Sequence, residues 1–236
     1  MSLYWRDWPV PLHSSAEVLA ELAENFQFYD DDILVNTFPK CGTTLVQEIV
    51  SCLVLGPERT RTTDLKLRSP FIDLNLPPEL PVPRPIDGAK KLDRPRVLKT
   101  HLPPAFHMRH LVAPSGPRNI IVMRNPKDAI VSTYHHMTSA RRDELSGEAD
   151  GRIPIHPLTE ALLHSVLQQT SFSAMQSNPM VNITLTDPER WRPGSNFIRR
   201  GEIGDWKRHF SAEDAELVDG IIEEKLAGSG LQFRYE

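Results

Sequence analysis

The chain has 236 residues, of which 39% are hydrophobic and 25% are charged, and its net charge is −4. This composition is that of an ordinary globular protein, and the length suits one sizeable α/β domain spanning 1–236. The negative net charge argues against a protein that binds nucleic acid or a membrane surface. The two cysteines are too few for a disulfide framework, which fits a reducing compartment. The sequence shows no apolar run long enough for a bilayer and no signal-like N-terminus. We therefore expect a cytoplasmic protein.

Apolar spacing predicts helices and strands that alternate along most of the chain. Strands are expected at 33–38, up to Lys99, Thr100 and His101, and at 119–123. Helices are expected at 15–26, at 43–55, from Pro126, at 158–169 and at 213–226. The Pro-rich stretch 56–95 reads as a connector with one short helix.

Alternating strands and helices indicate a parallel sheet with helices on its faces, and such sheets bind ligands at the carboxyl ends of their strands. Lys40, Lys99 with His101, and Arg124 each lie at the end of a predicted strand. We therefore expect these basic groups to converge on one edge of the sheet. The net charge would then hide a cationic pocket.

The segment PKCGTT, at 39–44, joins a predicted strand to a predicted helix. Free N–H groups at a helix start bind anions, and Gly42 lets the backbone approach a ligand. The order differs from a Walker A loop, GxxxxGK[ST], because the lysine precedes the glycine. Taken alone, the segment fits an anion site and an ordinary turn with an exposed Lys40 about equally well.

Two further segments carry candidate chemistry. In KTH, His101 has the titration range of a general base, although an isolated histidine is more often structural. In RNPKDAIVS, Arg124 and Ser132 are placed to bind a phosphate, unless Arg124 only pairs with Asp128. With the basic segment FIRRGEIGDWKRHF, two anion sites suggest a ligand such as a nucleoside 3′,5′-bisphosphate.

Five segments resemble the signature segments of the cytosolic sulfotransferases, in the same order. They are TFPKCGTTL, LKTHLP, RNPKDAIVSTYHH, QQTSFSAMQSNPMVN and FIRRGEIGDWKRHF. The resemblance implies a P-loop-like three-layer α/β/α fold. It also implies transfer of a sulfuryl group from 3′-phosphoadenosine 5′-phosphosulfate (PAPS) to a hydroxyl or amine of a small acceptor, without a metal.

The resemblance also implies roles for individual residues. The phosphosulfate would be bound by Lys40, Cys41, Gly42, Thr43 and Thr44. The 3′-phosphate would be bound by Arg124, Ser132, Arg199, Arg200 and Gly201, and the adenine would lie against Thr170 and Phe172. His101 would take the proton of the acceptor while Lys40 and Lys99 stabilise developing charge.

The sequence departs from the family pattern in three places. Cys41 stands where the family usually has Ser, and Leu45 where it has an adenine-stacking Trp. Between His136 and Thr170 the chain is too short for the family's strand–helix unit and lacks its adenine-contacting Tyr. We expect a sheet reduced to three parallel strands, with the strand before the PKCGTT loop left as an exposed edge.

These observations leave two functions open. The first is an active sulfotransferase with weakened cofactor binding, and the second is a non-catalytic homologue that binds a nucleotide or acts as a partner protein. A P-loop kinase is disfavoured by the Walker A order. Phe71, Phe106 and Met108 are acceptor-pocket candidates that fit a hydrophobic core equally well, and the segment from Lys207 to Glu216 resembles the family's dimer segment, which suggests a weak homodimer.

Overall fold

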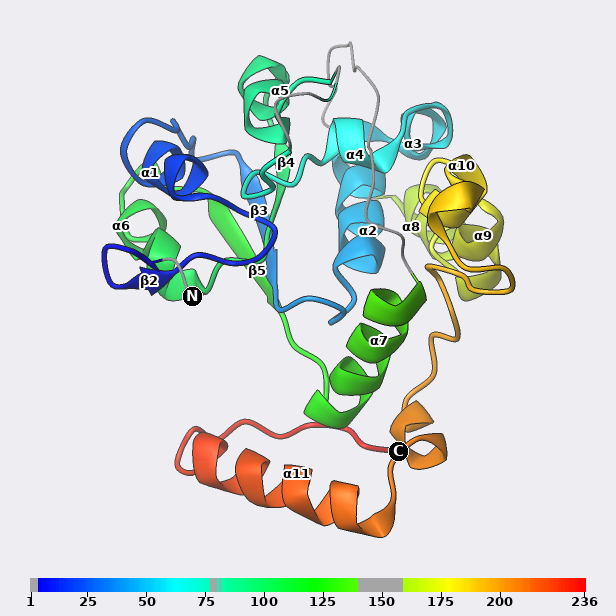
Figure 1. The fold of residues 1–236 in the computed structure, drawn as a ribbon. Coiled ribbons are helices and arrows are strands. Elements are labelled where there is room, and N and C mark those ends of the chain that lie inside the picture. The colour runs from blue at the N-terminus through cyan, green and yellow to red at the C-terminus, as the bar shows by residue number, and fades with distance from the viewer. Residues whose placement is uncertain (1–3, 77–79, 81, 140–158) are drawn as a thin grey trace.

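The computed structural model describes residues 4–76, 80, 82–139 and 159–236. Its central sheet has three parallel strands, β3 (Ile33–Thr37), β4 (Val97–Thr100) and β5 (Arg118–Val122), in the order β4-β3-β5 (Figure 1). Val35 of β3 pairs with Lys99 on one side and Ile120 on the other. The predicted number of parallel strands is confirmed. A short antiparallel pair near the N-terminus, β1 (Tyr4–Trp5) and β2 (Trp8–Pro9), was not predicted.

The longer helices lie close to their predicted positions. They are α1 (Ala16–Glu24), α2 (Thr43–Leu55), α7 (Pro126–Ser139), α8 (Glu160–Gln169) and α11 (Ala212–Leu226). Their start signals are local: Ser15 caps α1, Thr159 caps α8, and Ser211 with Asp214 forms a capping box at α11. Leu158, where we expected α8 to begin, lies outside the described residues.

The Pro-rich stretch contains three short helices where one was expected. They are α3 (Pro57–Thr62), α4 (Leu65–Arg68) and α5 (Pro85–Lys91). The correction has a local cause, because a proline in the first turn has a backbone already suited to a helix. Proline begins α3 and α5, and the Asp64 side chain accepts from the backbone N–H of Lys66 at the start of α4.

The remaining elements are shorter and follow the strands or α8. They are η1 (Pro104–His107), α6 (Met108–Leu111), α9 (Phe172–Ser177), α10 (Ile183–Thr186), η2 (Pro188–Arg190) and η3 (Asp205–Arg208). No helix in the described part of the chain has the length and apolar character needed to cross a membrane.

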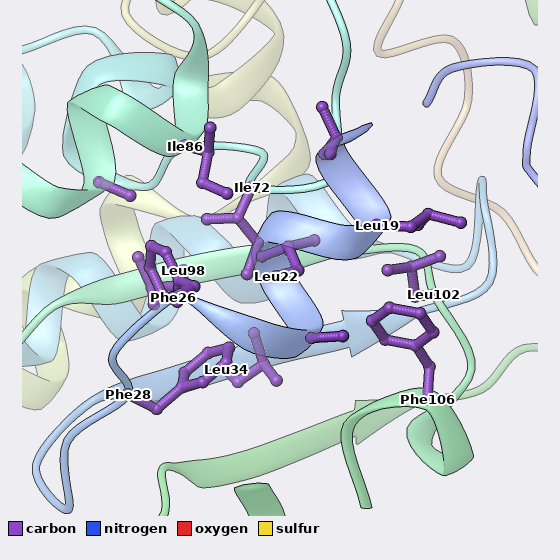
Figure 2. Close-up of a cluster of buried hydrophobic side chains, with 13 residues drawn as sticks. Leu19, Leu22, Phe26, Phe28, Leu34, Ile72, Ile86, Leu98, Leu102 and Phe106 are labelled. Carbon is purple, nitrogen blue, oxygen red and sulfur yellow. The ribbon is translucent and has the colours of Figure 1, made fainter. Parts of the chain in front are cut away.

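Helices pack on both faces of the sheet, which gives three layers. On one face, Leu34 and Leu98 join a buried cluster with Leu19 and Leu22 of α1 and Ile86 of α5 (Figure 2). On the other face, Val35 and Val97 pack against Val50 of α2. Because alternate strand residues point to opposite faces, the run Leu34-Val35 supplies both cores.

The edge prediction was wrong. The strand before the PKCGTT loop, β3, is central, because β4 and β5 both pair with it. The outer side of β4 is covered by an extended segment: Lys99 N–H donates to the Pro70 carbonyl at 3.0 Å, and Ile72 N–H donates to the Lys99 carbonyl at 3.0 Å. Within the described residues, the strand without a second neighbour is β5, where Ile121 is 51% exposed.

Candidate functional site

The loop between β3 and α2 is fixed by a contact between its two ends. The hydroxyl oxygens of Thr37 and Thr43 lie 2.5 Å apart, which ties the end of β3 to the first turn of α2. Between them the loop turns through left-handed conformations at Lys40 (φ 65°) and Gly42 (φ 99°). Space around Gly42 is open, so it is the positive φ that favours glycine. The turn leaves the backbone N–H groups at the start of α2 free to bind an anion.

His101 follows β4 and is oriented by Thr37. Its Nδ1 lies 2.7 Å from the Thr37 carbonyl oxygen, which can only accept, so Nδ1 carries the proton. Nε2 is therefore the nitrogen with a free lone pair. Burial and the charge of Lys99 lower the pKa of His101 to about 3, so the ring is neutral near pH 7. A neutral imidazole with a free Nε2 can accept a proton.

Two lysines lie at the same edge of the sheet. Burial, followed by the charges of Lys99, Arg124 and Arg199, lowers the pKa of Lys40 to about 7. Burial lowers the pKa of Lys99 to about 8, and the carboxylate of Asp73 opposes this shift. Each ammonium lies over an aromatic ring, Lys40 at 4.3 Å from the centre of Phe197 and Lys99 at 4.0 Å from that of Phe71. Crowded, poorly solvated cations bind an anion strongly.

Arg124, at the end of β5, links the loop to the basic C-terminal segment. Its guanidinium donates to the carbonyl of Lys40 and to that of Glu202, each at 3.3 Å. Asp128 lies 3.8 Å away. The carboxylate of Asp128 also accepts from the backbone N–H groups of Gly204 and Trp206 at 2.9 and 3.0 Å, so it anchors the segment rather than serving Arg124 alone.

The basic segment is organised around a buried aspartate. Asp205 is 2% exposed and pairs with Arg199, and it lies 3.6 Å from Arg200. Its carboxylate holds both guanidinium groups beside α7. Asp205 was not singled out from the sequence, although it lies within the quoted basic segment.

A cavity of about 520 Å³ brings Lys40, Ser132, Arg199 and Arg200 together. The other residues around it are His135, His136, Ser139, Trp191, Arg192, Pro193, Gly194, Ser195, Asn196, Phe197 and His209. Among the residues that the structure describes, no Asp or Glu lines it. The nitrogens His135 Nε2, His136 Nδ1 and Trp191 Nε1 are buried and have no hydrogen-bond partner in the described part of the chain, so a ligand with polar atoms could satisfy them.

Thr170 and Phe172 lie outside this set of lining residues. The Thr170 hydroxyl donates to the Val166 carbonyl at 2.8 Å and so completes the end of α8. Phe172 is 40% exposed and packs on Gly201: a Cβ at Gly201 would lie 2.5 Å from the ring. Gly201 also has a φ of 68°, so both the close contact and the backbone favour glycine there.

The remaining predicted residues have clear positions. Burial raises the pKa of Cys41 and leaves its thiol protonated, so Cys41 contributes mainly its backbone. Thr44 and Leu45 lie in the first turn of α2, with Leu45 42% exposed. Phe71 contacts His101 at a ring distance of 4.8 Å.

The other two acceptor-pocket candidates, Phe106 and Met108, lie in different surroundings from Phe71. Phe106 belongs to the core beside α1, and Met108 is 50% exposed. The aromatic residues Trp191 and Phe197 beside the cavity were not singled out from the sequence, although Phe197 is the first residue of the quoted basic segment.

Comparisons with known proteins agree with this geometry. The family model described as "Sulfotransferase domain" matches residues 30–149 and 155–230. Bovine (Bos taurus) sulfotransferase 1A1 is 30% identical over 275 aligned positions, covering 94% of this chain and 92% of the relative. Human (Homo sapiens) sulfotransferase 1C2 is 29% identical over 272 positions, covering 90% and 89%. Both alignments are longer than the chain, so the relatives have additional internal residues.

Two solved structures share the fold. A retinol dehydratase in complex with androsterone and the inactive cofactor PAP superposes with a TM-score of 0.71 at 17% identity, covering 93% of this chain and 88% of the other. Mouse sulfotransferase SULT7A1 complexed with PAP gives 0.63 at 18% identity, covering 98% and 96%. The family model, the curated relatives and the shared fold together show that this chain belongs to the cytosolic sulfotransferase family.

Proposed function

We propose that this protein transfers the sulfuryl group of PAPS to a hydroxyl or amine of a small acceptor in the cytoplasm. The observation that carries the proposal is the arrangement around Thr37. Its carbonyl leaves His101 with a free Nε2, and its hydroxyl ties β3 to the anion-binding start of α2. A base and an anion loop are thereby held at one edge of the sheet.

The residues present fit PAPS, which would supply the sulfuryl group. The loop from Lys40 to Thr44 would bind the 5′-phosphosulfate through backbone N–H groups and the Lys40 ammonium. Arg124, Ser132 and the run Arg199-Arg200-Gly201 would bind the 3′-phosphate. Three of these residues, Ser132, Arg199 and Arg200, line the cationic cavity together with Lys40, which supports this assignment. Thr170 and Phe172 would lie against the adenine.

Proton removal and charge stabilisation follow from the same geometry. His101 Nε2 would take the proton of the acceptor hydroxyl or amine. Lys40 and Lys99 would stabilise negative charge on the transferring group, in a poorly solvated site where such charges act strongly. In this proposal the two lysines provide the positive charge that a metal provides in other group transfers.

A second function stays open because the adenine contacts are depleted. Leu45 replaces an aromatic ring beside the loop, and stacking on a base contributes about 1–3 kcal/mol. A protein that binds the nucleotide weakly and serves as a partner would have the same basic groups. A weak homodimer through Lys207 to Glu216 fits either function.

Two substitutions test the chemistry. His101→Ala should lower turnover by about 10²- to 10⁴-fold and leave the affinity for adenosine 3′,5′-bisphosphate unchanged in calorimetry. Lys40→Ala should lower turnover and also lower the affinity for adenosine 3′,5′-bisphosphate. Turnover of His101→Ala within a few-fold of wild type would contradict the role of the base. Nucleotide binding by the wild type without turnover on a broad set of phenols, alcohols and amines would favour the non-catalytic function.

A further inference from the structure

A buried carboxylate lies directly behind His101. Asp73 is fully buried, and its two carboxylate oxygens lie 3.3 and 3.1 Å from the backbone nitrogen of His101. The same carboxylate lies 2.9 Å from Nε2 of His13. Because an ionised carboxylate only accepts hydrogen bonds, both nitrogens donate to it. Asp73 thus connects the main chain of the proposed base to a second histidine.

The fold brings three distant segments together at this point. The backbone of 70–72 pairs with Lys99, and this places Asp73 beside the end of β4. His13 arrives from the N-terminal segment, where its carbonyl accepts from the Asn75 N–H at 2.8 Å. The rings of Phe71, His13 and His101 form a triangle: the Phe71 ring lies 5.0 Å from His13 and 4.8 Å from His101, and the two imidazoles lie 6.0 Å apart, edge to face.

The surroundings favour the ionised form of Asp73. Burial acts to raise its pKa, but the hydrogen bond and charge of His13, with the contacts to His101, hold the pKa below its usual range. A buried carboxylate needs such partners, because an unpaired one is costly. His13 is only partly buried, with its side chain 26% exposed, so it closes the carboxylate off from solvent on that side.

We propose that Asp73 and His13 form a positioning pair for His101, which rests on the proposed role of His101 as the base. Asp73 fixes the His101 main chain so that Nδ1–H meets the Thr37 carbonyl and Nε2 remains free for the acceptor. His13 holds the Asp73 carboxylate in place through one hydrogen bond. Neither residue exchanges a proton with the acceptor.

The pair can be tested with variants that remove or restore the partners of the Asp73 carboxylate. His13→Ala removes the donor to Asp73, whereas His13→Gln keeps an N–H at the same reach. Asp73→Asn keeps the shape but removes the charge. Turnover should fall about ten-fold in His13→Ala and more in Asp73→Asn, and it should recover in His13→Gln, while the affinity for adenosine 3′,5′-bisphosphate stays constant. His164→Gln, an exposed histidine of α8, serves as the matched control.

A second measurement does not depend on turnover. Long-range ¹H–¹⁵N NMR of the histidine rings reports which nitrogen carries the proton, with the His101 signal identified by its loss in His101→Ala. The wild type should show the Nδ1–H form alone. His13→Ala and Asp73→Asn should show a mixture of both forms or a shifted Nδ1 signal.

The outcomes separate this proposal from the function. A His101 spectrum identical in all folded variants would overturn the positioning pair, whether or not the protein turns over. A changed spectrum in a protein without any transferase activity would support the pair and refute the catalytic function instead. Loss of turnover in His13→Gln equal to that in His13→Ala would also overturn the pair, because the restored hydrogen bond would then have no effect.

Discussion

The protonation of Lys40 links the affinity for an anion to pH. Its pKa is lowered to about 7 by burial and by neighbouring positive charges, and a bound phosphosulfate would raise it again. The protonated form therefore binds more tightly. The affinity for adenosine 3′,5′-bisphosphate should be highest below pH 7 and should fall as the pH rises through 7 toward the pKa of the bound state.

Calorimetry between pH 6.5 and 8.5 checks this dependence. Lys40→Arg provides the control, because arginine stays charged over the whole range. Its affinity should vary less with pH than that of the wild type. Equal pH dependence in the two proteins would show that Lys40 does not titrate in the binding site.

At the scale of the element, the first turn of α2 offers a way to restore stacking. Leu45 is 42% exposed there, one residue after the predicted phosphosulfate loop. Leu45→Trp should tighten the binding of adenosine 3′,5′-bisphosphate by about 1–3 kcal/mol, measured by calorimetry. The binding of pyrophosphate, which has no base, should not change.

Ile121→Trp is the matched control for that gain, because Ile121 is similarly exposed but lies on β5. It should leave nucleotide affinity unaltered. If Leu45→Trp tightens the binding of pyrophosphate as much as the binding of the nucleotide, the added ring does not stack on the adenine base.

The packing of α2 against α4 and α8 depends on a buried ion pair. Glu48 of α2 pairs with Arg68 of α4, both side chains are at most 2% exposed, and Gln169 of α8 reaches the same carboxylate at 3.3 Å. Arg68→Met would leave the carboxylate without its cation. We expect a loss of about 3–5 kcal/mol in the free energy of unfolding, measured in urea.

The double variant Arg68→Met with Glu48→Gln separates charge from packing. Removing the carboxylate charge should recover a large part of the lost stability. If the double variant is as unstable as Arg68→Met alone, the loss in the free energy of unfolding comes from the altered packing and not from the unpaired charge.

At the scale of the whole molecule, the sheet formed by the described residues ends at β5. No described strand pairs with the outer side of β5, where Ile121 is 51% and nearby Met123 is 55% exposed. Such an edge can pair with another chain. Ile121→Lys should therefore reduce heat-induced aggregation, followed by light scattering, with little change in the unfolding midpoint.

Leu12→Lys controls for added charge, because Leu12 is 94% exposed and lies far from β5 in sequence, in the N-terminal segment. It should change aggregation much less than Ile121→Lys. If Ile121→Lys and Leu12→Lys reduce aggregation equally, the reduction comes from the added charge and not from the position of Ile121 on the edge strand.

Local patterns in the sequence determined much of this protein. The bounds of α2, from Thr43 to Leu55, were predicted from helical spacing, and the same kind of pattern predicted α11 to within one residue of its start at Ala212. The convergence of Lys40, His101 and Arg124 followed from the rule for parallel strands. The five signature segments then indicated the family. Each segment is a short run of neighbouring residues, so it can be read directly from the sequence.

Only the tertiary structure decided which strand is central and what lies behind the base. Strand order depends on pairing between segments far apart, and no period along the chain records it, so β3 was wrongly expected at an edge. Asp73 contacts His13 and the backbone of His101 across long separations, and nothing in the local sequence of any of the three marks that contact. A buried carboxylate finds its partners through the packing of the whole sheet, and that packing is a property of the folded chain.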